Sequence, residues 1–277
     1  MSIRGKAVFG LMSAVLALSA SAVQATTLDD VKKKGELVIG MEVAYQPYEF
    51  FKDGEVIGYD VDIANRFAKS LGIKVKFVDT EWAGVIPALL TKKFDVILSG
   101  MTITSERSQK VNFSMPYAEA TSVILVRLDD TSIQTVDDVA GKKMGAQLGS
   151  AADKVAKDFE AQLKAKGKPG YTDYKLYEHY PEAYVDLTNK HIDAVVNSLS
   201  TLKVLIKEQP GKYRTVAGIQ NIQAFFGMAF RKDDTDFLKF VNDQFAEMKA
   251  NGELAALQKK WFGDVMETPN QVPEVLP

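Results

Sequence analysis

The sequence predicts an α/β protein made of two lobes, each a sheet flanked by helices. Apolar segments of strand character alternate with amphipathic helical segments, and this order implies parallel sheets covered by helices. Two further strand-like runs interrupt the alternation and enclose a self-contained set of strands and helices. The length of 277 residues allows one large domain or two modest ones, and 46% hydrophobic residues supply ample side chains for a core.

Strand–helix units recur along the chain. Apolar residues at helical spacing predict a helix over Val61–Leu71. Strands are expected at Leu37–Met41, Val75–Val78, Val96–Ser99, Lys143–Gln147 and Asp193–Asn197, and further helices at Val85–Leu90, Ser150–Phe159 and Ser200–Lys207.

The runs Val123–Arg127 and Phe226–Arg231 do not begin simple strand–helix units. We interpret them as the two places where the chain crosses between lobes. The first lobe then holds residues 26–124 and 229–277, and the second lobe is the insert 125–228, which has the size of a typical domain.

The first 25 residues have the pattern of a secretory signal peptide. Arg4 and Lys6 precede an apolar run, Ala7–Leu18, and Val23-Gln24-Ala25 then fits the small-x-small rule for cleavage after residue 25. The apolar run is too short to cross a bilayer of about 30 Å as a helix. The chain has no cysteine, which excludes disulfides and a lipid anchor on an N-terminal cysteine. We therefore expect a monomer that is free in the periplasm.

Other function classes lack their sequence signals. The net charge of −2 gives no basic excess of the kind that marks a nucleic-acid partner. His179 and His191 are isolated and lack metal-ligand spacing, and no phosphate-binding loop or Ser/His/Asp set occurs. We expect no cofactor and no metal.

Polar residues follow the predicted strands of both lobes. In open α/β sheets, ligands bind beyond the carboxyl ends of the strands. The residues at these positions are Glu42, then Ser99, Gly100, Met101 and Thr102 in the first lobe, and Gln147, Gly149, Ser150, Asn197 and Ser198 in the second. A small molecule held between them would be enclosed when the lobes close.

Long segments of the chain resemble one known family. They are GELVIGMEVAYQPYEF (Gly35–Phe50), GYDVDIANRFAKSLG (Gly58–Gly72), WAGVIPALLTKKFDVILSGMTITSERSQKVNFSMPY (Trp82–Tyr117) and KKWFG (Lys259–Gly263). They resemble the periplasmic polar-amino-acid- and opine-binding proteins of ABC importers, bacterial solute-binding protein family 3. The resemblance implies a type II periplasmic-binding-protein fold that closes by hinge bending, without catalysis, and delivers its ligand to an inner-membrane permease.

The resemblance also implies a carboxylate site. In the family, the arginine at the position of Arg107 binds the α-carboxylate of the ligand, and its planar guanidinium suits this role. Thr102 and the backbone around Ser99 and Gly100 complete that site. The turn Gln147–Ser150 is the clamp of the second lobe, where the N-terminus of a helix attracts an anion. The alternatives are a surface arginine paired with Glu106 or another acid, and an ordinary helix cap at Ser150 that binds no ligand.

The body of the ligand lies between two aromatic residues in the family, at the positions of Tyr45 and Trp82. Aromatic faces favour apolar chains and cations, although core packing is the commonest role of such residues. An acid at the position of Glu42 often reads a cationic or amide end of the ligand. The alternative for Glu42 is a solvated surface acid.

Ser198 departs from the family pattern, because many members carry there an aspartate that binds the α-ammonium of the ligand. The segment reads Asp193-Ala194-Val195-Val196-Asn197-Ser198, so no charge is available at this position. Opine-binding relatives show a similar pattern. We therefore expect an opine-like or otherwise N-modified basic amino acid as ligand, with a free basic amino acid as runner-up. Drift, with another acid serving the same need, is the alternative.

Two other functions stay open from the sequence. Some proteins with this fold, such as cyclohexadienyl dehydratases, convert ligands in the cleft, and an enzyme would need an acid or base near the reacting atom. Glu42 is the one clear candidate in the first lobe. A sensory protein that presents the same ligands to a chemoreceptor is the other.

Overall fold

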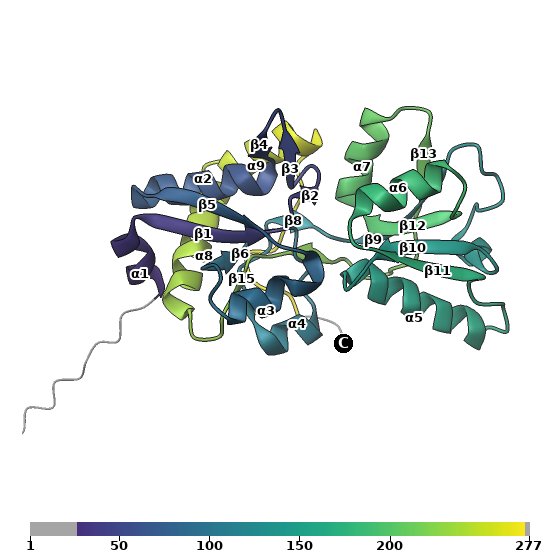
Figure 1. Cartoon of the computed structure of the whole chain (residues 1–277), viewed down its shortest axis with the longest axis horizontal. Helices are drawn as coiled ribbons and strands as arrows, with labels where there is room; N and C mark the ends of the chain where they lie inside the picture. The colour runs from purple at the N-terminus through teal and green to yellow at the C-terminus, as the bar shows by residue number, and fades with distance from the viewer. Residues whose placement is uncertain (1–26, 275–277) are drawn as a thin grey trace, which may run out of the picture.

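The computed structural model describes residues 27–274, and the expected signal peptide lies outside this range. Two lobes lie side by side, joined by a narrow waist of extended chain (Figure 1). The predicted two-lobed α/β fold is therefore confirmed. None of the helices within residues 27–274 combines the length and the apolar composition that crossing a bilayer requires.

The first lobe is built on a five-stranded sheet with the order β5–β1–β6–β15–β7. Its strands are β1 (Glu36–Met41), β5 (Lys74–Asp79), β6 (Val96–Ile97), β7 (Asn112–Phe113) and β15 (Ala229–Phe230). β1 pairs in parallel with β5 and β6, whereas β15 is antiparallel to β6. Because parallel strands point the same way, the chain after β1 and after β6 emerges at the same edge of the sheet.

Helices cover both faces of this sheet (Figure 1). They are α1 (Thr27–Lys34), α2 (Tyr59–Leu71), α3 (Val85–Leu90), α4 (Ser105–Lys110), α8 (Thr235–Ala250) and α9 (Glu253–Phe262), with the short 3-10 helix η1 (Trp82–Gly84) before α3. A three-stranded sheet of β2 (Ala44–Tyr45), β3 (Glu49–Lys52) and β4 (Glu55–Ile57) extends beside α9.

The second lobe is a five-stranded sheet with the order β11–β10–β12–β9–β13. Its strands are β9 (Ser122–Arg127), β10 (Lys143–Gln147), β11 (Asp173–Tyr177), β12 (Ala194–Ser198) and β13 (Tyr213–Val216). Helix α5 (Ala151–Ala165) lies on one face, and α6 (Tyr180–Thr188) and α7 (Leu199–Glu208) lie on the other, with the 3-10 helix η2 (Val136–Val139) in the loop before β10 (Figure 1).

The expectation of parallel sheets is confirmed for β1, β5, β6, β10, β11 and β12, but both sheets also contain antiparallel strands. β10 is parallel to β11 and β12, but β9 runs antiparallel to both of its neighbours, β12 and β13. All six residues of β9 are buried, as in a central parallel strand. A continuous apolar run is therefore typical of a buried strand but gives no information on its direction.

The interpretation of Val123–Arg127 as a crossing is also wrong, because this run is β9, inside the second sheet. The run Phe226–Arg231 divides between β14 (Phe225–Phe226) and β15. The crossings are the antiparallel pair β8 (Ala118–Glu119) and β14, which form a two-stranded sheet at the waist. The lobe limits at 124, 125, 228 and 229 stay a prediction, and β9 already pairs with β12 from Ser122 onward.

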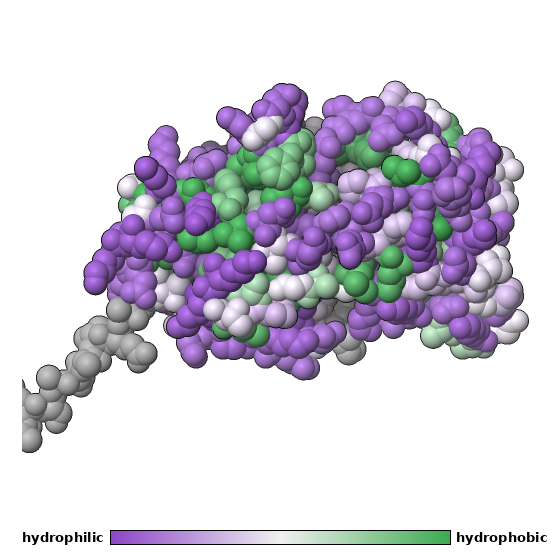
Figure 2. All heavy atoms as spheres, in the orientation of Figure 1, coloured by the Kyte–Doolittle hydropathy of each residue, from purple (hydrophilic) through white to green (hydrophobic). Residues whose placement is uncertain are grey.

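Each lobe has apolar side chains sealed inside it. In the first lobe, the ring of Phe67 from α2 lies 5.1 Å from that of Phe245 from α8, and neither is exposed. In the second lobe, Met144, Phe159 and Leu163 pack with apolar side chains of β9 and β12 in one buried cluster. On the face shown in Figure 2, hydrophilic side chains surround the apolar ones that reach the surface. Each lobe thus has buried apolar packing, and a further buried cluster joins residues of both lobes, among them Leu37 of β1 and Leu125 of β9.

Candidate functional site

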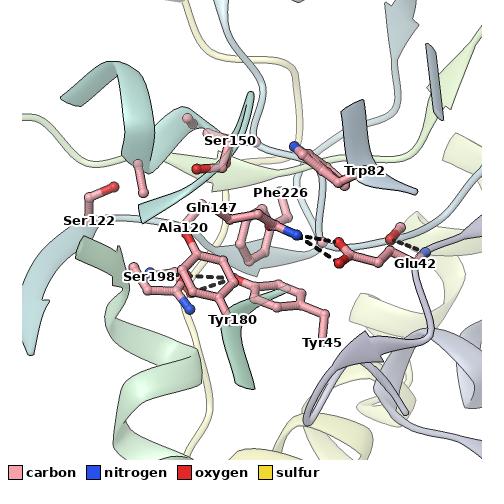
Figure 3. A pocket seen from close by; sticks show the side chains of 16 residues that line it. Glu42, Tyr45, Trp82, Ala120, Ser122, Gln147, Ser150, Tyr180, Ser198 and Phe226 are labelled. Atoms are coloured by element: carbon pink, nitrogen blue, oxygen red, sulfur yellow. Dashed lines mark hydrogen bonds between the residues drawn. The ribbon is translucent and has the colours of Figure 1, made fainter. Parts of the chain in front are cut away.

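A cavity with an empty volume of about 370 Å³, part of it open to solvent, lies between the two lobes (Figure 3). Its walls come from both lobes and from the waist. The lining residues are Glu42, Tyr45, Trp82, Ser99, Gly100, Thr102, Ala120, Ser122, Gln147, Ser150, Ala151, Ala152, Tyr180, Asn197, Ser198 and Phe226. The residues that follow the predicted strands, except Met101 and Gly149, therefore come together at one place.

Three of the predicted site residues do not line this cavity. Met101 is fully buried and packs with Phe225 and Ala229 in a core cluster of the first lobe. Gly149 contributes its carbonyl oxygen, which accepts hydrogen bonds from Trp82 and Arg107 across the cleft. Arg107 itself lies beside the cavity, against the lining residue Thr102.

The turn after β6 brings backbone close to the aromatic wall. Gly100 adopts the left-handed region at φ 45°, and a Cβ atom there would lie 2.7 Å from the ring of Tyr45. The Gly100 amide donates to Asp60 at 2.9 Å, and the Ser99 hydroxyl donates to Glu49 at 2.7 Å. Two buried acids thus hold this turn in place from behind.

Arg107 is held by carbonyl oxygens and an aromatic ring, and no acid of the described residues forms a salt bridge with it. Its guanidinium donates to the carbonyl oxygens of Thr102 at 3.0 Å and Gly149 at 3.1 Å and lies 5.1 Å from the Trp82 ring centroid. No salt bridge to Arg107 forms within residues 27–274, since Glu106 pairs with Lys110 instead. Burial lowers the pKa of Arg107 to about 10, which leaves the side chain charged at neutral pH. The alternative of a surface arginine paired with Glu106 is therefore wrong.

The N-terminus of α5 approaches the cavity from the second lobe. Ser150 is the N-cap and accepts from the Asp153 amide at 3.0 Å, so the predicted cap is confirmed. Ala151 and Ala152, the first two helical residues, line the cavity. The first amides of a helix lack intrahelical acceptors and carry partial positive charge. Arg107 and α5 thus offer donors to an anion from opposite lobes.

Tyr45 joins the lobes through its ring and its hydroxyl. The hydroxyl lies 3.0 Å from Asn197 Oδ1 and 3.0 Å from Ser198 Oγ, and the ring stacks with that of Tyr180 at 5.7 Å (Figure 3). The Asn197 amide donates to Tyr184 at 2.8 Å. Asn197 and Ser198 therefore present neutral, hydrogen-bonded groups to the cavity.

Trp82 lies at the other wall, in η1. Its indole Nε1 donates to the Gly149 carbonyl at 3.2 Å, and its face receives the Arg107 guanidinium. The side chain is only partly buried, so Trp82 is not a core residue. Tyr45 and Trp82 face a common cavity, as the resemblance implies for a ligand held between them.

Glu42 is buried, with 2% of its surface exposed, so the alternative of a solvated surface acid is wrong. Both carboxylate oxygens accept from Gln147 Nε2 at 2.7 Å, and Oε1 lies 2.6 Å from His179 Nδ1. Burial raises the pKa of Glu42, while the hydrogen bonds from His179 and Gln147 act in the opposite direction. Its partners come from the opposite lobe, a connection that no sequence spacing indicated.

His179 looks isolated in the sequence, but in the structure it has close partners. It occupies the N-cap of α6, and its Nε2 also lies 3.5 Å from Glu81. The hydrogen bond to Glu42 raises the pKa of His179 above its ordinary value. Potential metal-ligand atoms of Glu81, Glu178 and His179 lie within 4.8 Å of one another. We assign no metal ion to them, because both carboxylates are exposed to solvent.

Sequence reasoning also missed Tyr180, Phe226, Ala120, Ser122, Ala151 and Ala152. Tyr180 is the first residue of α6, shortly after β11 ends. The other candidate site residues were chosen because they follow strands, and Tyr180 is in the same kind of position. Phe226 belongs to β14 and Ala120 follows β8, both at the waist, whereas Ser122 begins β9 in the second sheet.

Known proteins match this chain over nearly the whole described region. A model of bacterial extracellular solute-binding proteins, family 3, matches residues 37–264. The L-cystine-binding protein TcyJ of Escherichia coli K12 is 35% identical over 239 residues, which cover 85% of this chain and 86% of the relative. The L-arginine-binding protein of Pseudomonas aeruginosa is 31% identical over 258 residues, which cover 91% of this chain and 97% of the relative.

Solved structures agree with these matches. The ancestral amino acid-binding protein AncCDT-1, described as a precursor of cyclohexadienyl dehydratase, has a TM-score of 0.78 and 35% identity and covers 86% of this chain and 100% of that one. An ancestral arginine-binding protein bound to arginine has a TM-score of 0.73 and 34% identity and covers 83% of this chain and 99% of that one. The residues that build the cavity all fall within the range of the family match.

Proposed function

Because the chain belongs to the family 3 bacterial extracellular solute-binding proteins, we propose that it is the receptor of an ABC importer and binds an amino acid or an amino-acid derivative. The observation that carries this proposal is the charged Arg107 beside the interlobe cavity, with carbonyl oxygens but no carboxylate among its described partners. The α-carboxylate of a ligand supplies the negative charge that Arg107 lacks among these partners. It can also accept two parallel hydrogen bonds from the guanidinium in a bidentate pair.

The binding step follows from these contacts. The ligand carboxylate accepts hydrogen bonds from Arg107 in the first lobe and from the backbone amides at the N-terminus of α5 in the second. A ligand that bonds to both lobes stabilises the closed arrangement over the open one by its extra contacts. The waist strands β8 and β14 are the hinge about which the lobes move.

The ligand amine meets a neutral surface at Asn197 and Ser198. An amine that carries a second carboxyl-bearing group, as in opines, suits such a surface better than a free ammonium does, because an aspartate there would repel the added carboxylate. Free amino acids are the alternative, and relatives named for L-cystine and L-arginine support it.

Binding without catalysis is favoured over a cleft enzyme. A catalytic acid or base must reach the proton that it transfers, whereas the Glu42 carboxylate is already occupied by Gln147 and His179. The amino-acid-binding names of the relatives support the same conclusion. We further propose that the mature protein is a periplasmic monomer and docks in its closed form on a membrane permease.

A thermal-shift screen against amino acids, opines and polyamines tests this proposal. A ligand at 100 times its dissociation constant stabilises the folded state by about 2.7 kcal/mol, which shifts the melting temperature clearly. We expect a shift with at least one α-carboxylate compound and none with polyamines, which lack a carboxylate. A screen in which no amino acid or derivative shifts the melting temperature would refute the proposal.

A further inference from the structure

Four polar side chains join the lobes at one end of the cavity. Glu42 and Glu81 come from the first lobe, and Gln147 and His179 from the second. His179 lies between the two acids, with Nδ1 2.6 Å from Glu42 and Nε2 3.5 Å from Glu81. Gln147 lies on the cavity side and donates to both oxygens of Glu42 (Figure 3).

Glu42 is the one carboxylate among the residues that line the cavity, so within the described chain it is the natural partner for a cationic ligand side chain. In the structure, the His179 imidazole of the protein already lies against this carboxylate, at 2.6 Å. The other charged groups facing His179 are all acids, namely Glu81, Glu178 and Glu182. They favour the protonated imidazole, which neutralises Glu42.

We propose that His179 is a positioning residue that occupies Glu42 when the lobes close and thereby selects an amino-acid ligand with a neutral side chain over one with a cationic side chain. The inference rests on the proposed function. The sequence predicts a ligand with a basic side-chain end. We instead infer a neutral, hydrogen-bonding side-chain end, which would lie beside the side-chain amide of Gln147.

The physical reason is competition for one buried carboxylate. A cationic side chain reaches Glu42 only if His179 gives up its proton or leaves, because two cations on one acid repel each other. A neutral side chain requires neither change. Binding of a cationic ligand therefore releases a proton, and its affinity rises with pH up to the pKa of His179, whereas that of a neutral ligand does not.

L-Arginine and L-citrulline are the probes, because they have nearly the same shape and differ in charge. We expect calorimetry at pH 6 to show tighter binding of citrulline, with the difference shrinking towards pH 9. His179→Gln removes the titrating cation and is expected to shift the arginine-to-citrulline affinity ratio about tenfold towards arginine, the size of one pKa unit. It should also flatten the pH dependence of that ratio.

His191→Gln is the matched control. His191 is the only other histidine of the chain, is exposed, pairs with Asp186 and does not line the cavity. Melting curves confirm that both variants fold. An unchanged ratio in His179→Gln, an equal change in His191→Gln, or a wild type that prefers arginine at pH 6 would each overturn the inference. Absence of binding by every amino acid in the thermal-shift screen would instead refute the proposed function, and the inference with it.

Discussion

Ser198 ends β12 within a cluster of neutral hydroxyl groups. Its Oγ lies 3.0 Å from the Tyr45 hydroxyl and donates to Thr201 at 2.9 Å. All three side chains are buried, so a charge placed there would have little solvent to screen it. The identity of this one residue therefore has a large effect on which amine the proposed site accepts.

Ser198→Asp is expected to tighten the binding of free α-amino acids and to weaken that of N-substituted analogues with a second carboxylate. A hydrogen bond to a charged group contributes about 1.5–3 kcal/mol, or roughly 10- to 150-fold in affinity. Calorimetry with arginine and octopine measures both effects, since octopine is arginine with a carboxyl-bearing group on its amine. Ser198→Asn, which adds size without charge, is the control. Equal affinities in all three proteins would show that the amine lies elsewhere.

Glu42 and His179 show what a single sequence hides at the scale of residues. Glu42 was identifiable because it follows a strand, and burial confirms that it is no surface acid. His179 lies 137 positions away and in the other lobe. Its pairing depends on how the lobes meet, and neither local spacing nor residue type carries that information.

At the scale of elements, two buried acids support the strand-end turn of the proposed site. Glu49 from β3 and Asp60 from α2 are fully buried, and a hydrogen bond joins their two carboxyl groups, which requires that one of them carries a proton. Burial raises the pKa of both, that of Asp60 to about 7, and the Asp60 charge raises that of Glu49 further. The other titratable groups that interact with the pair are Glu42, Tyr48, Tyr59 and Tyr117, so within residues 27–274 no cation compensates.

The pair predicts a stability that declines as the pH rises. Raised pKa values mean that the folded state holds a proton that the unfolded state releases. This contribution is fully present below the ordinary carboxyl values of about 4 and is lost as the pH rises through about 7. We expect the melting temperature to fall between pH 5 and pH 8. Glu49→Gln, which needs no proton, should flatten the curve, and a variant curve parallel to the wild-type curve would contradict this account.

The strand–helix units were predictable because each consists of a short apolar run, typical of a buried strand, followed by a segment whose apolar residues recur at helical spacing. Lys143–Gln147 was expected as a strand and is β10, and the expected helix Val61–Leu71 lies within α2. The direction of β9 and the place of the waist were not predictable. Both depend on which strands pair, and β8 and β14 are only two residues long, too short for a periodic signal.

At the scale of the whole molecule, direct bonds hold the lobes together around the cavity. Besides the contacts at the cavity, the Gln46 side chain donates to Glu208 at 2.8 Å, and the Tyr48 hydroxyl lies 2.9 Å from Ser200 Oγ. Such contacts must break for a ligand to enter, and the waist offers two short strands about which the lobes can turn. A ligand that bridges the lobes shifts this equilibrium towards the closed form.

Ligand is therefore expected to reduce the radius of gyration in small-angle scattering. The titration uses the compound with the largest thermal shift, and the change should saturate with the calorimetric affinity. The control is Arg107→Ala at the same ligand concentration, where the radius should stay at its ligand-free value. Saturation with ligand at an unchanged wild-type radius would argue against closure as the mechanism.

A ligand carboxylate that binds Arg107 between the lobes is the core of the proposed function. Isothermal titration calorimetry of the wild type and Arg107→Ala with the same ligand tests it most directly, with melting curves to show that both proteins fold. Removing one partner of a buried charge pair costs about 2–5 kcal/mol, so we predict a loss of affinity of roughly 30- to 5,000-fold. A folded Arg107→Ala protein that binds the ligand as tightly as the wild type would contradict the account.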